Sequence, residues 1–583
     1  MKNFFKTTLA VFAALIIFSV VSGIVSIAML SAFAAIGTAE TTLQENSVLR
    51  INLTGSLTER VNEESLEYLL AQANNQPTPL GLNDLRSSIK KATNADEIKA
   101  IYLNCGSLSA SPASAQELRT LLENFQTESG KPIYAYGDNY SQAAYWVASI
   151  ADTLMLNPQG SIALVGMATQ IPFFHEALDK LGVKMEIFKV GTFKSAVEPY
   201  ILDEISEPNR LQNEKMLSGI WSEMLADISA SRAISTEEIN QAIDGGLAFS
   251  EVNDIIALGL IDSAMYRNEM TAFLKEQFGE DYHMVSLKEM KSAPSTEKFS
   301  MNKVAVLYAT GEIDSEAEGE MDSEDIVKEL NRLANNDDVK AVVLRVNSPG
   351  GSAFGSEQMW FAAKQLRAKK PLIVSMSDYA ASGGYYMSCI ADTIVAQPTT
   401  LTGSIGIFGM FPNFAGVADK IGVNFSTVKT NEIADLGNTM RPKTDSERAI
   451  LQNYINRGYE LFISRCAEGR NTSNDDIKLV AEGRVWTGAD ALELGLVDVL
   501  GGLDDAVAIA ATKAGLTDNY AVAEYPKQKD AFTQLLEDIT GESLTSIILK
   551  TKLANSEYSF LTPHSSFHIP QGAQAIMPYR VEL

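Results

Sequence analysis

The chain has 583 residues, more than one ordinary hydrophobic core accommodates, so we expect at least two domains. Its formal net charge of -26 and a sequence pI near 4.7 argue against a nucleic-acid-binding surface, which needs clustered Lys and Arg. The three cysteines are widely spaced and odd in number, so the sequence predicts neither a disulfide framework nor a CxxC metal site.

The N-terminal segment is apolar enough to cross a membrane. Lys2 and Lys6 precede an uncharged stretch, Thr7–Ala39, whose core, Leu9–Ile36, is long enough to span a bilayer. With both lysines on the short side, the positive-inside rule places the N-terminus in the cytoplasm and the rest of the chain outside it. A cleaved signal peptide is the alternative, because Ala32-Phe33-Ala34 resembles a cleavage site. The length of the apolar run favours a retained anchor.

Two copies of one domain follow the anchor. SVLRINLTGSLTER (residues 47–60) and KVAVLYATGEID (residues 303–314) each predict a strand that ends at a Thr-Gly turn. Further matches recur at offsets between 236 and 243 positions, which indicates a tandem duplication. In both copies short apolar strands alternate with helical stretches, the pattern of parallel βαβ units. The matches pair residues 96–104 with 337–347, 150–162 with 390–405, 178–183 with 418–423 and 257–262 with 493–498.

The duplication sets the expected domain boundaries. A polar stretch from Lys288 to Ser300, which contains Pro294, is the expected linker between the copies. Each copy ends in a helical region, Asn209–Ile228 and Glu447–Ile463, whose apolar spacing predicts packing against a core. The proline-containing tail predicts an extended arm with exposed histidines. The expected divisions are a membrane anchor at 1–45, a first repeat at 46–295, a second repeat at 296–548 and a C-terminal arm at 549–583.

One serine of the second copy has the setting of a nucleophile. Leu372–Val374 predicts a buried strand and residues 380–391 continue as a helix, so Ser382 lies at a strand-to-helix turn. The two glycines after it, Gly383 and Gly384, let a substrate carbonyl approach backbone N–H groups. The helix dipole favours the oxyanion of an attacked carbonyl. The alternative is that Ser382 only caps the helix.

A second glycine turn offers a further N–H group. Residues 345–352 read RVNSPGGS, in which an apolar strand runs into a Pro-Gly-Gly turn. The N–H of Gly350 or Gly351 is the expected oxyanion donor beside the N–H of Gly383. The first copy has NCGSLS at this place, so both turns are peculiar to the second copy.

Comparison of the two copies also points to a base. At an offset of 240, Ser382 corresponds to Gln142, so the first copy has no equivalent serine. The reverse holds for Lys194 of VGTFKSAVEPY, which corresponds to Ala434. A serine hydroxyl needs a group that takes its proton, and the four histidines of the chain offer few candidates for a Ser-His-Asp triad. Lys194 is therefore the candidate general base.

A lysine acts as a base near neutral pH only when burial lowers its pKa. Phe193, Val197 and Tyr200 are the expected apolar surround of Lys194. Glu198 would raise the lysine pKa if it lay close, so we expect it to point away into a structural ion pair. The alternative is that Lys194 is an ordinary surface charge.

The motifs YAASGGYYMS, RVNSPGGS, LTGSIGIFG and GTFKSAVEPY resemble those of the signal peptide peptidase A, or protease IV, family in its long duplicated form. The resemblance implies tandem Clp-protease/crotonase-like α/β domains, an N-terminal transmembrane helix, and a Ser-Lys dyad of Ser382 as nucleophile and Lys194 as general base. It also implies that Ser404 orients the lysine amine. The first copy keeps Ser161 at the matching motif, which leaves a simple turn role for Ser404 as the alternative. A membrane-anchored homotetramer with apolar substrate clefts is a further implication.

From these residues and this resemblance we expect a membrane-bound serine endopeptidase that degrades signal peptides after their release. The Gly351 and Gly383 N–H groups would hold the oxyanion. We expect no metal or organic cofactor and no nucleic-acid partner. The expected location is the bacterial inner membrane, with a single span and the catalytic domain on the periplasmic side. Two alternatives stay open: a crotonase-like acyl-CoA enzyme and a non-catalytic membrane scaffold.

Overall fold

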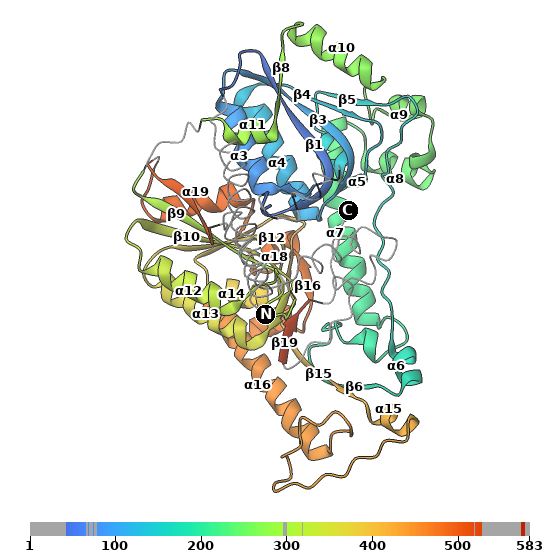
Figure 1. Ribbon diagram of the computed structural model, residues 1–583, viewed down its shortest axis with the longest axis vertical. Helices are drawn as coiled ribbons and strands as arrows, with labels where there is room; N and C mark the ends of the chain where they lie inside the picture. Colours follow the sequence, from blue (N-terminus) through green and yellow to red (C-terminus); the bar gives the residue numbers. More distant parts are fainter. Residues whose placement is uncertain are drawn as a thin grey trace, which may run out of the picture.

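The computed structural model describes residues 42–294, 300–527 and 573–577, apart from positions 64, 66, 67, 69, 70, 72, 73, 75–77, 318 and 518. Most of the expected membrane anchor, residues 1–41, lies outside this range. Among the described residues, no helix combines the length and the apolar character that a membrane span requires. Figure 1 shows two α/β lobes, one above the other, with the long helix α7 (Glu207–Arg232) running from the upper lobe down beside the lower one.

The first repeat is built on a parallel sheet. Strands β1 (Ser47–Thr58), β3 (Ile98–Ser109), β4 (Ile133–Gly137) and β5 (Thr153–Leu156) lie side by side in this order. Their apolar residues are buried, as expected for a parallel sheet covered on both faces. The other elements are β2 (Leu80–Gly81), α3 (Leu82–Asn94), α4 (Pro112–Ser129), α5 (Gln142–Ala148), α6 (His175–Leu181), β6 (Lys184–Val190), α8 (Thr236–Asp244), α9 (Val252–Leu258), β7 (Ser263–Ala264), α10 (Arg267–Phe278), β8 (His283–Ser286) and α11 (Leu287–Ser292).

The core strands of the second repeat follow the same order as those of the first. Its sheet places β9 (Lys303–Thr310), β10 (Val339–Ser348), β12 (Leu372–Ala381) and β13 (Thr393–Ala396) side by side and parallel. The expected duplication of a parallel α/β unit is thereby confirmed. The other elements are β11 (Gly350–Ser352), α12 (Ser323–Ala334), α13 (Ala353–Arg367), α14 (Gly383–Ser388), β14 (Leu401–Gly403), β15 (Ile407–Asn413), α15 (Ala415–Lys420), α16 (Asp445–Arg470), α17 (Asn474–Val480), β16 (Val485–Thr487), α18 (Gly488–Glu493), β17 (Val499–Leu500), α19 (Leu503–Lys513), β18 (Ala521–Tyr525) and β19 (Ala573–Ile576).

Two expected boundaries differ from the structure. The helix expected over residues 380–391 is shorter, because β12 extends to Ala381 and α14 covers only Gly383–Ser388. The expected linker begins inside α11, where a capping box formed by Ser286 and Glu289 starts the helix and Met290 is buried. The polar residues Lys288 and Glu289 at the start of that stretch therefore lie on the exposed side of a short helix.

A third, smaller sheet combines strands from both repeats, in the order β11-β19-β15-β6. β6 of the first repeat runs antiparallel to β15 of the second, with Val190 opposite Ile407 and Lys184 opposite Asn413. Backbone hydrogen bonds thus join the two halves of the chain, and β6 leads the first repeat directly to the edge of the second. This sheet brings distant sequence segments to one place.

Buried charges also join the repeats. The guanidinium of Arg345 on β10 donates to Glu59 Oε1 at 2.8 Å and to Glu117 Oε2 at 2.7 Å, both from the first repeat. Asp378 on β12 accepts hydrogen bonds from the backbone N–H and hydroxyl of Ser114, each at 2.8 Å. All these side chains are buried, and desolvation raises the pKa of Asp378 to about 6. The polar contacts satisfy charges that would otherwise be costly to bury.

Candidate active site

Ser382 occupies a strained turn between β12 and α14. Its φ of 54° and ψ of -112° lie where residues with a side chain are uncommon, and its side chain is fully buried. It stands at the N-cap position of α14, but its hydroxyl makes no capping hydrogen bond to that helix. The simple capping role considered above therefore does not describe it, and the hydroxyl is available for another partner.

That partner is Lys194. Its Nζ lies 2.7 Å from Ser382 Oγ, although the two residues are 188 positions apart and belong to different repeats. The same Nζ donates to Ser404 Oγ at 3.0 Å and to Ser404 O at 3.1 Å. Lys194 is fully buried, and this desolvation holds its pKa well below the ordinary lysine value. Burial therefore favours the neutral amine, whose lone pair can accept a proton.

The loop that follows β6 places the lysine. Gly191 has a φ of 111°, and its carbonyl accepts from Lys194 N at 3.3 Å. On the opposite side the second repeat holds the loop, because Phe193 N donates to Glu482 O at 2.8 Å. Gly483 comes so close that a Cβ added there would lie 2.7 Å from Lys194 Cβ. The lysine backbone is therefore clamped between the repeats.

Glu198 points away from the amine, as expected, but its partners are not those expected. It is buried and accepts from the Ser206 hydroxyl at 2.6 Å and from Asn209 Nδ2 at 2.9 Å. These neutral donors lie at the start of α7, where a carboxylate also suits the helix dipole. The expected ion pair is thus replaced by hydrogen bonds that fasten the lysine loop to α7.

The Pro-Gly-Gly turn approaches the serine from β10. Gly350 donates its N–H to Ser348 Oγ at 3.2 Å, and its carbonyl accepts from Ile313 N at 2.8 Å. Ser352 N donates back to Ile313 O at 2.9 Å, so the N–H of Gly351 between these two residues points to the opposite side, toward β19. Gly383 opens α14. Gly351 and Gly383 therefore lie in the neighbourhood of Ser382, and their roles as oxyanion donors stay predictions.

Ser404 has its own local constraint. It lies at a φ of 51°, and its N–H donates to Arg484 O at 2.7 Å. Its counterpart Ser161 instead donates its hydroxyl to Asn139 at 3.0 Å and only shapes a turn. The two matching serines therefore differ in their contacts, because only Ser404 reaches a buried lysine.

Sequence reasoning missed two residues that hold the lysine loop. Gln212 on α7 lies with its Nε2 3.4 Å from Ser195 Oγ and accepts from Val485 N at 2.8 Å, which ties helix, loop and second repeat together. Gly483 permits the close approach to Lys194 described above. Neither residue belongs to a motif that would have marked it. The placement of Gln212 on a long amphipathic helix gave no hint of a polar contact at the site.

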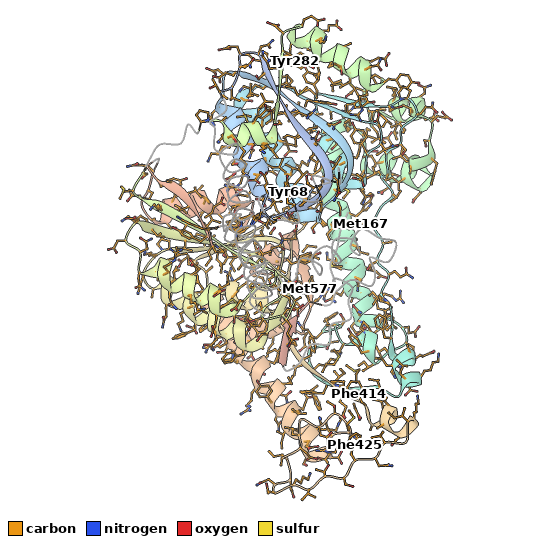
Figure 2. The ribbon with its side chains drawn as sticks, in the orientation of Figure 1. Tyr68, Met167, Tyr282, Phe414, Phe425 and Met577 are labelled. Atoms are coloured by element: carbon orange, nitrogen blue, oxygen red, sulfur yellow. The ribbon has the colours of Figure 1, made fainter. Side chains whose placement is uncertain are left out.

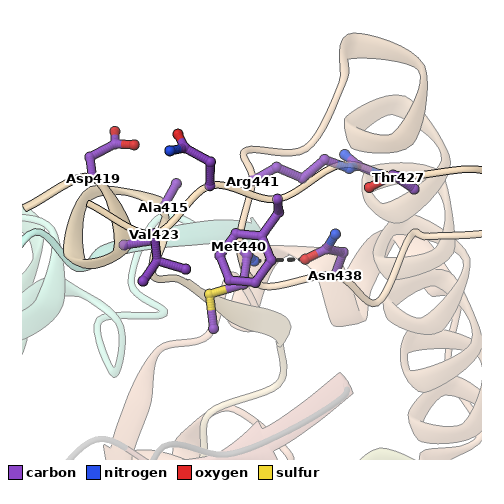
Figure 3. Close-up of a pocket in the computed structure, with 10 residues that line it drawn as sticks. Ala415, Asp419, Val423, Thr427, Asn438, Met440 and Arg441 are labelled. Atoms are coloured by element: carbon purple, nitrogen blue, oxygen red, sulfur yellow. Dashed lines mark hydrogen bonds between the residues drawn. The ribbon is translucent and has the colours of Figure 1, made fainter. Parts of the chain in front are cut away.

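A separate hollow of about 250 Å³ lies around α15 (Figure 3). Its lining comes from the segment between residues 415 and 441, including Phe425, Met440 and Arg441. None of its lining residues is among the predicted site residues. The hollow therefore adds nothing to the chemistry at Ser382.

The fold and the site together define a class of protein, a serine peptidase built from two α/β repeats. The family model for peptidase family S49 matches residues 126–279 and again residues 364–517, two segments that begin 238 positions apart. The chain belongs to peptidase family S49. Two matches at this spacing agree with the duplication that the sequence predicted.

Named relatives agree with this assignment. The chain is 33% identical over 524 residues to "Protease 4" of Haemophilus influenzae, covering 85% of this chain and 83% of that protein. It is 31% identical to "Serine protease SPPA, chloroplastic" of Arabidopsis thaliana, covering 87% of this chain and 75% of that protein. A "Putative signal peptide peptidase SppA" of Enterococcus faecium is 32% identical, with 42% and 71% covered. The expected peptidase activity is confirmed. It replaces the two alternatives considered above, a crotonase-like acyl-CoA enzyme and a non-catalytic membrane scaffold.

Proposed function

We propose that the peptidase works through a Ser-Lys dyad, with Ser382 as nucleophile and Lys194 as general base. The observation that carries the proposal is the 2.7 Å contact between Lys194 Nζ and Ser382 Oγ in a fully buried setting. Lys194 takes the hydroxyl proton as Ser382 Oγ attacks the scissile carbonyl. The protonated amine then gives this proton to the leaving amine, and an acyl-enzyme forms.

The second half of the reaction uses the same groups. Lys194 takes a proton from water, the resulting hydroxide attacks the acyl-enzyme, and Ser382 leaves with the proton restored. The N–H groups of Gly383 and Gly351 hold the oxyanion in both steps. Ser404 fixes the amine on its other side through hydroxyl and carbonyl contacts of 3.0 and 3.1 Å. No step needs a metal or an organic cofactor.

The proposed substrates are signal peptides after their release, cleaved by a protein anchored in the bacterial inner membrane with its catalytic domain in the periplasm. Support for the substrate comes from the name of the Enterococcus faecium relative. Support for the anchor and the location is the uncharged stretch Thr7–Ala39 with the lysines that precede it. The Clp-protease/crotonase-like assignment of both repeats belongs to the same proposal.

The proposed assembly is a homotetramer closed by strand pairing between copies. Inside the chain, β6 of the first repeat pairs with β15 of the second. The counterparts of these strands, residues 423–430 of the second repeat and 163–174 of the first, form no helix or strand in the described chain. Apolar side chains stand exposed in the first of these segments, among them Phe425 and Val428, of which Val428 is 100% exposed. A second copy would supply the missing partner for each segment, and this repeated pairing would generate a ring.

Hydrolysis of an apolar fluorogenic peptide by the full-length protein in detergent tests the dyad. We expect Ser382→Ala and Lys194→Ala each to lower kcat/KM by about a thousandfold or more, with folding checked by circular dichroism. The matched control is Gln142→Ala, the same change at the counterpart of Ser382, which should leave activity within about twofold. Near-normal activity of Lys194→Ala would place the base elsewhere and overturn the proposal.

A further inference from the structure

The strand that leads to Ser382 carries a bulge. β10 and β12 pair residue for residue up to Val346, which stands opposite Met376. The next pair is Ser348 with Ala380, so β12 advances by four residues while β10 advances by two. Bulges bend a strand and redirect the side chains that follow them. This bulge lies directly before the turn that presents Ser382.

One side chain of β10 spans the bulge. Asn347 is the residue of β10 that stands opposite residues 377–379 of β12. Its Oδ1 accepts from Tyr379 N at 3.2 Å, and its Nδ2 donates to Asp378 Oδ2 at 3.0 Å. The amide therefore supplies hydrogen bonds where the regular strand pairing is interrupted. Tyr379 packs in an apolar cluster with Met577, which Figure 2 shows in the middle of the molecule, between α7 and the second repeat.

The first repeat holds the other side of the bulge. The buried Asp378 accepts through its Oδ1 from the backbone N–H and the hydroxyl of Ser114, each at 2.8 Å, at the start of α4. A carboxylate at this end of a helix also suits the helix dipole. Beside it, the Ser377 hydroxyl donates to Glu59, which directly follows β1. The bulge is therefore held between Asn347 of its own repeat and the first repeat.

The corresponding strands of the first repeat are paired differently. β3 and β4 pair residue for residue up to their last pair, Cys105 and Gly137. The next residue, Asp138, corresponds to Asp378 at the offset of 240. Its carboxylate is 45% exposed and pairs at 2.5 Å with Arg267 of its own repeat. The bulge and the contact across the repeats thus occur in the copy that carries the proposed nucleophile.

The residue after Asn347 contacts both glycine segments of the site. Ser348 Oγ accepts from Gly350 N at 3.2 Å, in the Pro-Gly-Gly turn. On the other side, Gly384 comes so close that a Cβ added there would lie 2.8 Å from Ser348 O. A shift of β12 against β10 at the bulge would therefore move Ser382 relative to that turn.

We propose that Asp378 and Asn347 are positioning residues of the reaction, which hold the β12 bulge and thereby set the position of Ser382. This inference rests on the proposed function, because it takes Ser382 as the nucleophile. Asp378 makes the bulge depend on the docked first repeat, since one of its oxygens is held by Ser114. A misplacement of about 1 Å at a reacting group costs about a hundredfold in rate, so loss of the bulge should lower kcat and leave peptide binding in place.

The activity test exchanges the two side chains in the full chain. Asp378→Asn keeps the shape of the side chain, but an amide cannot accept from all the donors that Ser114 and Asn347 present. We expect kcat for an apolar fluorogenic peptide to fall by about 30- to 100-fold, with KM within about twofold. Adding Asn347→Asp returns a carboxylate to the pair, which accepts from Tyr379 N and from the new amide. We expect this exchange to restore kcat by about tenfold or more.

The matched control is Asp138→Asn, the same change at the counterpart of Asp378, and kcat should stay within about twofold. Circular dichroism checks the fold of each variant. Should Asp378→Asn not fold, Asn347→Ser replaces it, because it removes both contacts of the amide without changing the charge, and the same loss of kcat is expected. Unchanged kcat in a folded variant, or no recovery on exchange, would overturn the inference.

Ser382→Ala, measured in the same assay, separates this inference from the catalytic proposal. We expect Ser382→Ala to be inactive and Asp378→Asn to keep a low but measurable kcat. Activity of Ser382→Ala would overturn the proposed nucleophile and, with it, this inference. An inactive Ser382→Ala beside a fully active Asp378→Asn would overturn the positioning role alone and leave the Ser-Lys dyad in place.

Discussion

The two repeats share their framework but differ at the positions that carry chemistry. At the corresponding strand-to-helix turns, Ser382 sits at a φ of 54° with its hydroxyl on a lysine, whereas Gln142 begins a regular helix capped by Ser141. Gln142 uses its side-chain oxygen to accept from Val165 N and Gly166 N at 3.1 Å, which fixes a loop. Backbone strain is thus found in the copy that carries the proposed nucleophile, whereas the other copy has an ordinary capped helix at this place.

The lysine shows the reverse difference. Lys194 follows β6, which crosses to the second repeat and pairs with β15. Its counterpart Ala434 lies in an exposed turn, in a segment without a strand to carry it inward. Position relative to the partner repeat, rather than residue type alone, therefore determines which copy can supply the proposed base.

The sharpest way to break this comparison is to move the lysine. Lys194→Ala should lower kcat/KM for an apolar peptide by about 10³- to 10⁴-fold, because the serine loses its proton acceptor. Adding Ala434→Lys to that variant should restore nothing, since residue 434 lies in an exposed turn and not in the buried loop that follows β6. Recovery of more than tenfold would mean that the two positions are equivalent after all. Steady-state hydrolysis measures both variants.

The buried charges between the repeats offer a second test, on stability. Arg345→Met should destabilise the protein by about 3–5 kcal/mol, because Glu59 and Glu117 would lose the cation that compensates their burial. The midpoint of urea unfolding reports the change. Arg457→Met, at an exposed position of α16, is the control and should change stability by no more than about 0.5 kcal/mol. Equal midpoints for the two variants would contradict the structural role of the contacts that Arg345 makes with Glu59 and Glu117.

Burial of Lys194 should lower the free energy of unfolding of the protein. In the unfolded chain Lys194 carries a proton at pH 7, whereas burial lowers its pKa in the folded protein, so stability rises with pH until the unfolded lysine itself deprotonates near about pH 10. Lys194→Met should therefore raise the unfolding free energy by about 1–2 kcal/mol at pH 7, with the gain shrinking toward pH 10.

Thermal melting at a series of pH values measures this effect. Lys340→Met, at an exposed lysine on β10, is the control and should show no such pH dependence. A gain from Lys194→Met that is the same at pH 7 and pH 10 would mean that the lysine is charged in the folded protein.

The smallest expected effect separates the two matching serines. Ser404→Ala removes the 3.0 Å contact to the lysine amine and should lower kcat/KM about tenfold, the value of one hydrogen bond to a positioned group. Ser161→Ala, which removes only a contact to Asn139, should leave kcat/KM unchanged. Equal changes in kcat/KM for the two variants would mean that Ser404, like Ser161, only shapes a turn. Both variants are compared in the same peptide assay.

Much of the fold and the core of the site could be predicted from the sequence. The internal repeat supplied a reference for each position, and it singled out Ser382 and Lys194 because each is present in one copy and absent from the other. The apolar strands that alternate with helices predicted parallel sheets correctly. These features are local or periodic along the chain, so the sequence alone is enough to detect them.

The contacts between repeats could not be predicted in this way. Nothing in the apolar pattern of β6 says that its partner is β15, since strand periodicity sets the buried face but not the neighbour. Arg345 sits in an apolar run, and the two carboxylates that pair with it come from separate parts of the first repeat. The segment Ala573–Ile576, short and rich in alanine, resembles a tail and not a strand between two others.

The separation of Lys194 and Ser382 by 188 positions also fixes a delay between the synthesis of the two residues on the ribosome. Ribosomes add about 5–20 residues per second, so roughly 10–40 s pass between synthesis of the proposed base and synthesis of the proposed nucleophile. During that interval the emerging chain carries only one of the two proposed catalytic residues. In the proposed mechanism, activity therefore requires that both repeats are synthesised and folded together.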